Sequence, residues 1–172
     1  MPSLTPHEDL EKIQQTLTQR IHHRGIVPGE LKLTLKHATA TGELLMRNAA
    51  GLAQAAADHH RERTTTYLAQ LSVLSSSVQV RLGAPASVLR CPVPSGLKPL
   101  NALSGTVTQA CKTGTQMMVL PIKHLEKNLA GEQIDTDLLL LHLHELQRQI
   151  SITAELMQID LPAKILEITD PS

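Results

Sequence analysis

The chain has 172 residues, which is long enough for one domain with its own hydrophobic core. Its 16 basic and 16 acidic residues cancel, so no overall field attracts nucleic acid or acidic membranes. Aromatic residues make up only 1% of the chain, which disfavours all-β folds and removes the rings on which unpaired bases usually stack. We therefore expect no nucleic-acid partner.

The first predicted helix covers residues 6–23. Thr5, Pro6 and Glu8 form a helix-start signal, in which a capping residue precedes proline and a glutamate follows. One apolar face then recurs at spacings of three and four residues: Leu10, Ile13, Leu17 and Ile21. Residues 29–36 alternate apolar and polar side chains, which suits a short strand or an irregular start of the next helix.

Residues 38–82 contain no proline and are rich in helix-forming side chains. An unbroken helix here would be about 65 Å long, so the alternatives are one long amphipathic helix or a helical hairpin broken near the polar residues 58–66. Its second half places four residues on one face, and we expect them to form an interface: Tyr67, Leu71, Leu74 and Val78.

Prolines and glycines gather in residues 83–99, which predicts a linker. The chain would then divide into an N-terminal helical region of residues 1–82, this linker, and a C-terminal helical region of residues 100–172. A single domain overall is the alternative. After the linker, the apolar spacing predicts a helix that ends before Pro121, followed by a short helix carrying Ile122, Leu125 and Leu129.

The last long helix begins near Asp135 or Thr136 and repeats apolar residues every 3.5 positions, as coiled coils do. We expect this seam to contact partner helices of the same protein or of another, through Leu139, Leu143, Leu146, Ile150 and Met157. Pro162 is predicted to end the helix, and residues 163–169 could be extended.

Candidate chemistry is sparse. His142 and His144 are two residues apart, so on a helix they point about 200° apart and cannot share one metal ion. His59 and His60 are better interpreted as part of a solvated polar patch. The chain has no GxSxG, HExxH, GxGxxG or phosphate-binding P-loop motif. We therefore assign no catalytic, cofactor-binding or metal-binding residue and expect no cofactor.

These observations predict an all-α helical bundle with a C-terminal coiled-coil-like helix and at most short extended segments. The expected function is that of a non-enzymatic helical adaptor or assembly subunit that binds partner helices. One alternative is a small helical-bundle enzyme or ligand-binding domain whose pocket holds His59, His60 and Tyr67. The other is a subunit or chaperone of a secretion or filament apparatus. Without a secretory signal pattern or an apolar run of about 18 residues, we expect a cytoplasmic location and no transmembrane segment.

Overall fold

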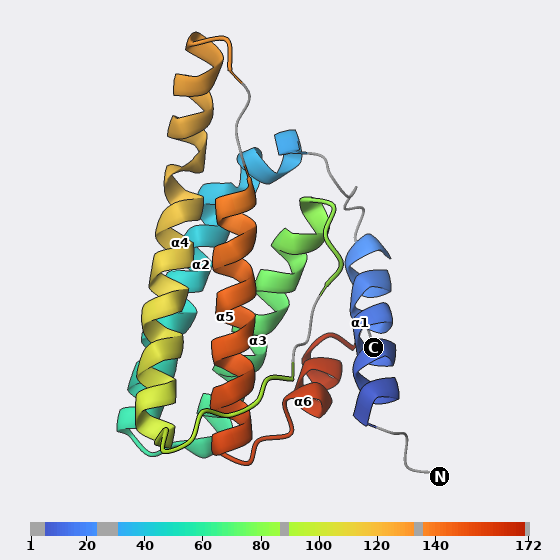
Figure 1. The fold of residues 1–172 in the computed structure, drawn as a ribbon, viewed down its shortest axis with the longest axis vertical. Helices are drawn as coiled ribbons and strands as arrows, with labels where there is room; N and C mark the ends of the chain where they lie inside the picture. The colour runs from blue at the N-terminus through green and yellow to red at the C-terminus, as the bar shows by residue number, and fades with distance from the viewer. Residues whose placement is uncertain (1–5, 24–30, 87–89, 133–135, 171–172) are drawn as a thin grey trace.

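The computed structural model describes residues 6–23, 31–86, 90–132 and 136–170. These residues form six helices and no strand, so the predicted all-α helical bundle is confirmed (Figure 1). The helices are α1 (Pro6–His23), α2 (Leu31–Ala57), α3 (Arg61–Arg81), α4 (Pro99–Leu129), α5 (Asp137–Leu156) and α6 (Leu161–Ile168).

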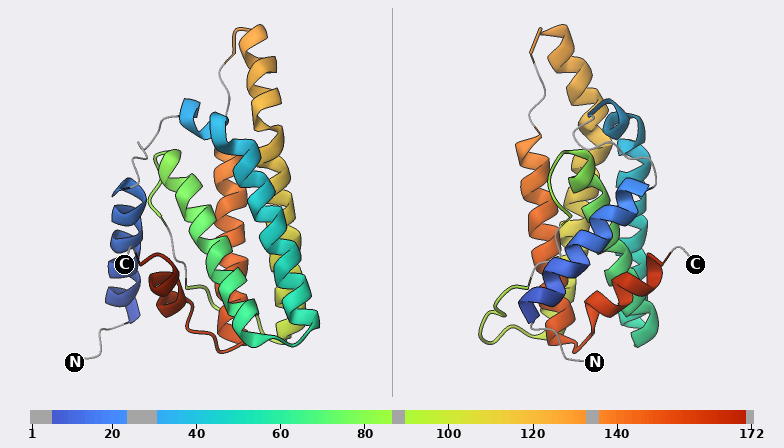
Figure 2. Two further views of the ribbon diagram at one scale, coloured as in Figure 1. Left: turned by 180° about the vertical axis from the view of Figure 1, so that it is seen from behind. Right: turned by 90° about the vertical axis from the view of Figure 1, so that its right-hand side faces the viewer.

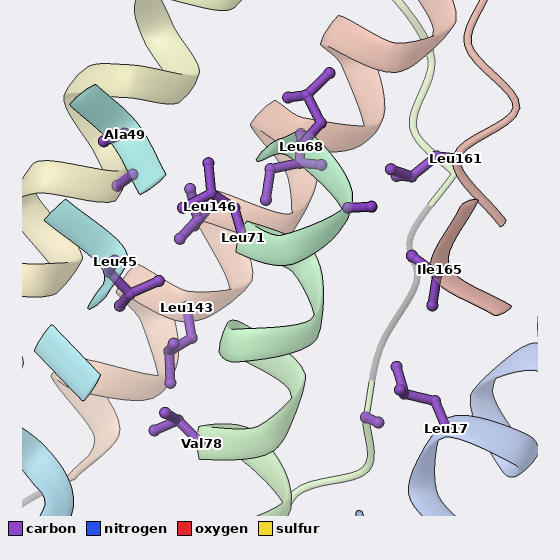
Figure 3. Packing of buried hydrophobic residues seen from close by; sticks show 14 of the residues in the cluster. Leu17, Leu45, Ala49, Leu68, Leu71, Val78, Leu143, Leu146, Leu161 and Ile165 are labelled. Carbon is purple, nitrogen blue, oxygen red and sulfur yellow. The ribbon is translucent and has the colours of Figure 1, made fainter. Parts of the chain in front are cut away.

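Four of the helices form a bundle in which every pair of neighbours is antiparallel. α2 packs against α3 and α4, and α5 packs against the same two helices from the opposite side (Figures 1 and 2). Leucine and alanine side chains from α2, α3 and α5 meet at the centre of the bundle, as Leu45, Leu71 and Leu143 do (Figure 3). The core draws on helices from both sides of residues 83–99.

The short helices α1 and α6 lie together beside α3, outside the four-helix bundle (Figure 2). Leu17 of α1 faces Ile165 of α6, and both side chains are buried (Figure 3). The guanidinium of Arg20 donates hydrogen bonds to the Leu166 carbonyl at 3.0 Å and to Thr169 Oγ1 at 2.5 Å. These contacts hold α1 against the C-terminal end of α6.

Buried polar side chains fix the position of α5 against α3. The Gln147 amide accepts a hydrogen bond from Ser72 Oγ at 2.8 Å and donates to Ser76 Oγ at 2.9 Å. All three side chains are buried. Because an unpaired buried amide is costly, this network favours one alignment of the two helices over shifted ones.

Of the two alternatives for residues 29–36, the structure adopts the helix start and not the strand, since residues 31–36 form the first turns of α2; residues 29 and 30 lie outside the described part of the chain. The alternation covers only a few residues and consists mainly of leucine and lysine, which are good helix formers. Of the two alternatives for residues 38–82, the structure adopts the hairpin. Its turn places His59 at a positive φ of 54° and uses His60 Nδ1 to accept a hydrogen bond from the Arg63 amide.

Two prolines behave differently from their predicted roles. α4 continues through Pro121 instead of ending before it, because buried Met117 and Leu120 anchor the preceding turn. Proline removes only its own amide donor there, and the helix continues on both sides. Pro162 lies in the first turn of α6, where no donor is needed, and Asp160 caps that helix by accepting from the Ala163 amide at 3.2 Å. The expected extended segment at 163–169 is therefore wrong.

Candidate interaction surface

The residues predicted to form an interface lie in or against the core of the single chain. On α5 and α3 the buried members are Leu139, Leu143, Leu146, Ile150, Leu71 and Val78. Tyr67, Leu74 and Met157 are half-buried and pack against the same core. A partner could reach the buried side chains only after the bundle had opened, so their contact with another chain stays a prediction.

Tyr67 has a role in packing between α2 and α3. Its ring covers Gly51 so closely that a Cβ atom at position 51 would lie 2.4 Å from Tyr67 Cζ. A side chain of any size at position 51 would displace the ring. Leu74 has a different surrounding: it lines a shallow surface hollow of about 320 Å³ between α2, α3 and α6, together with Leu44 and Ile168.

The three residues of the alternative ligand pocket do not converge. His59 lines a hollow of about 210 Å³ with Leu103 and Met157, near the turn between α2 and α3. His60 caps α3, and Tyr67 lies on Gly51. Neither of these two side chains lines the hollow that contains His59.

The histidines of α5 also lie apart from one another. His142 Nδ1 lies 3.2 Å from the Gln109 amide nitrogen, at the contact between α4 and α5, whereas His144 is exposed. In the part of the chain that the structure describes, no three His, Cys, Asp or Glu side chains gather in a way that could hold a metal ion.

The clearest candidate surface lies on the last three turns of α4. Four apolar side chains follow one face there at spacings of four, three and four residues, and we call them the apex stripe: Met118, Ile122, Leu125 and Leu129. Their exposed fractions are 37%, 66%, 60% and 82%. Isolated exposed leucines are common, but a row of four on one helix face is characteristic of a contact surface.

The apex stripe is exposed because α4 is longer than the helices it packs on. With 31 residues α4 is about 46 Å long, whereas the 20 residues of α5 span about 30 Å. The buried residues of α4 end at Leu120, and the rest of the helix rises clear of the bundle (Figure 1). On the α2 side, Gly42 packs against the first residue of the stripe: a Cβ atom at Gly42 would lie 2.8 Å from Met118 Cγ.

Local interactions keep this projecting segment helical. Lys127 donates to Glu132 at 2.6 Å, and this hydrogen bond lowers the pKa of the Glu132 carboxyl and raises the pKa of the Lys127 ammonium. Gly131 adopts a φ of 70°, and the Glu132 amide bonds the Lys127 carbonyl at 2.8 Å, which closes the last turn. The charged groups lie off the stripe, which leaves its surface apolar.

Sequence reasoning placed three of these residues on a short helix but did not identify them as a surface. The missed signal is the spacing of four residues from Met118 to Ile122, which continues across Pro121. Interpreting the proline as a boundary divided one stripe between two predicted helices.

Comparison with known proteins adds no assignment: no family model, no curated protein and no solved structure matches the chain. Among the described helices, none combines the length and apolar character needed to cross a membrane.

Proposed function

We propose that the protein is a non-enzymatic helical adaptor or assembly subunit, and that the apex stripe is the surface with which it binds an apolar helix. The observation that carries this proposal is the row of four exposed apolar side chains on the part of α4 that projects beyond the bundle. A well-formed helix with a bare apolar face favours helix-on-helix binding, since the binding helix needs little ordering.

The energy available from the apex stripe suits a reversible partner. Burying a whole leucine, isoleucine or methionine side chain stabilises by about 1.5–3 kcal/mol. Scaled by the exposed fractions, the four residues supply roughly 4–7 kcal/mol, and a partner helix would supply a similar amount. Association costs about 4–15 kcal/mol, which offsets most of this gain, so the complex should be weak and reversible.

The proposal includes a cytoplasmic location. It is supported by the two cysteines, Cys91 and Cys111, which are both free and half-buried. Burial raises the pKa of the Cys91 thiol, which keeps it protonated and slow to react. Unpaired thiols of this kind are usual in reducing compartments.

A site-specific photo-crosslinker tests the proposal. Benzoylphenylalanine is placed at position 125 in the apex stripe and, as a matched control, at position 100 in the first turn of the same helix. Leu100 is 75% exposed, so both positions tolerate a large side chain, but Leu100 lies outside the stripe. Irradiation in the native host is expected to give discrete protein adducts from position 125 and none from position 100.

The proposal fails if position 125 gives no adduct, or if both positions give the same adducts. Mass spectrometry of the adduct from position 125 identifies the partner and the helix that carries the crosslink.

A further inference from the structure

We infer that a second copy of this chain binds the apex stripe, antiparallel, across a two-fold axis that crosses α4 between Lys123 and His124. This inference rests on the proposed function and names the partner for the same surface. Three features of the described residues support it: the spacing of the stripe, the position of α2, and the charges beside the stripe.

The spacing of the apex stripe is the same in both directions. Its intervals of four, three and four residues are palindromic, and a two-fold interface requires a surface that is complementary to itself. With the axis between residues 123 and 124, Met118 faces Leu129 of the second copy, and Ile122 faces Leu125. Each layer then pairs a long side chain with another, as in the seam of an antiparallel coiled coil.

The position of α2 excludes a parallel pair. α2 covers the face of α4 that leads up to the stripe, because Gly42 contacts Gly114, Met117 and Met118. A parallel second copy would extend its own α4 along that face and collide with α2. An antiparallel copy ends its α4 near Met118, and its bundle lies beyond Leu129, where no other described helix flanks the projecting end of α4 (Figure 1).

The charges beside the stripe are compatible with this register. Glu126 flanks the seam and would lie beside Val119 of the second copy, so two carboxylates do not meet. Pro121 would lie beside Asn128. Lys123 lies at the level of the axis but in an outer position of the heptad, and its side chain is exposed.

The size of the contact sets its strength. The three turns from Met118 to Leu129 are about 18 Å long. One helix pair of this length is at the small end of specific interfaces, below about 1,200 Å² of buried surface. The dimer should therefore be weak, forming only at high protein concentration and dissociating on dilution.

Charge complementation tests the pairing and its direction. Sedimentation equilibrium of the full chain over a concentration series is compared for wild type, Ile122→Lys, Leu125→Glu, and an equal mixture of the two variants. Each variant alone is expected to weaken the dimer by about a hundredfold, because a charge would be buried against an apolar side chain. In the mixture, one layer pairs Lys with Glu and the other keeps Ile122 with Leu125, so dimers reappear.

Controls separate loss of binding from loss of folding. Leu100→Glu carries the same charge change at an exposed apolar residue of the same helix and should leave the dimer intact. Helical circular dichroism should be unchanged for every variant, since the substituted residues are at least 60% exposed.

Each outcome decides a different point. A wild type that remains monomeric up to several hundred micromolar overturns the second copy as partner, while crosslinking from position 125 to another protein would still support the proposed function. A wild-type dimer that Leu125→Glu leaves intact overturns the stripe as the contact. Variants that are monomeric alone and also when mixed overturn the antiparallel register.

Discussion

Replacing Gly114 by alanine tests how closely α2 and α4 approach each other. A Cβ atom at position 114 would lie 2.8 Å from Met46 Cγ and 2.9 Å from the Gly42 carbonyl oxygen. The methionine side chain can move aside, but the carbonyl oxygen moves only with α2 itself. The glycine pair therefore sets the distance between the two helices.

The expected change in the free energy of unfolding for Gly114→Ala is the difference between a gain in helix propensity and a cost of packing. Alanine favours a helix over glycine by about 1 kcal/mol, whereas forcing atoms into a packed contact costs about 1–3 kcal/mol. Because backbone of α2 forms part of the obstacle, we expect the higher part of that range and a net destabilisation of roughly 1–2 kcal/mol.

Gly105→Ala provides a matched control on the same helix. The nearest atom to its new Cβ would be Gln149 Oε1 at 2.9 Å, at the flexible end of a side chain. Since this side chain can rotate away, the gain in helix propensity should dominate and stabilise the protein by about 0.5–1 kcal/mol.

Urea unfolding followed by circular dichroism measures both variants, and midpoints are compared at an unchanged m value. Opposite signs for Gly114→Ala and Gly105→Ala are the expected result. If Gly114→Ala stabilises as much as the control does, α2 and α4 do not lie in the close contact described here. Gly42→Ala should also destabilise, because its Cβ would lie 2.7 Å from the Gly114 carbonyl oxygen.

Three further predictions concern the core and one ion pair. Gln147→Ala should lower the free energy of unfolding by about 1–3 kcal/mol by leaving the buried Ser72 hydroxyl without its partner; a neutral effect in urea unfolding would argue against that network. Leu143→Ala should cost about 2–5 kcal/mol, and a loss below about 1 kcal/mol would mean that this side chain is not packed in the core. The hydrogen bond from Lys164 lowers the pKa of Glu62 below its ordinary 4.5. The Lys164–Glu62 pair therefore stabilises the folded protein above pH 4.5, and this contribution is lost as the pH falls through the lowered pKa that Glu62 has in the folded protein. In wild type, part of the fall in melting temperature at acid pH should come from the loss of this pair, and Glu62→Gln should remove that part. A variant whose melting temperature depends on pH as the wild type's does would contradict the pairing.

Apolar periodicity predicted the helices whose ends coincide with strong local signals. Residues 6–23 were predicted from one apolar face that ends before Gly25, and α1 has those bounds. The hairpin was harder to place, because neither glycine nor proline marks its turn. The chain turns at His59 in the left-handed region, which few residues other than glycine adopt, and local propensity does not predict that choice.

The predictions that Pro121 and Pro162 each end a helix were wrong for the same physical reason. A proline removes one backbone hydrogen-bond donor and restricts the backbone conformation of the residue before it, and both effects are local. Whether a helix survives them depends on how firmly its neighbouring turns are packed, which sequence spacing does not report. Met117 and Leu120 provide that packing before Pro121, and the Asp160 cap makes Pro162 a helix start.

The apex stripe and the leucine seam of α5 have the same spacing, yet the seam is buried within the chain and the stripe is bare. Spacing predicts that a helix face will be covered, but it does not say by which chain. The alignment of α4 with α5 decides this: Thr113 contacts the carbonyl of His142, so in an antiparallel pair Asp137, the first residue of α5, lies opposite Met118. Beyond that level α4 has no α5 residue across from it. The extension of α4 past the end of α5 is therefore what leaves this apolar face uncovered within the chain.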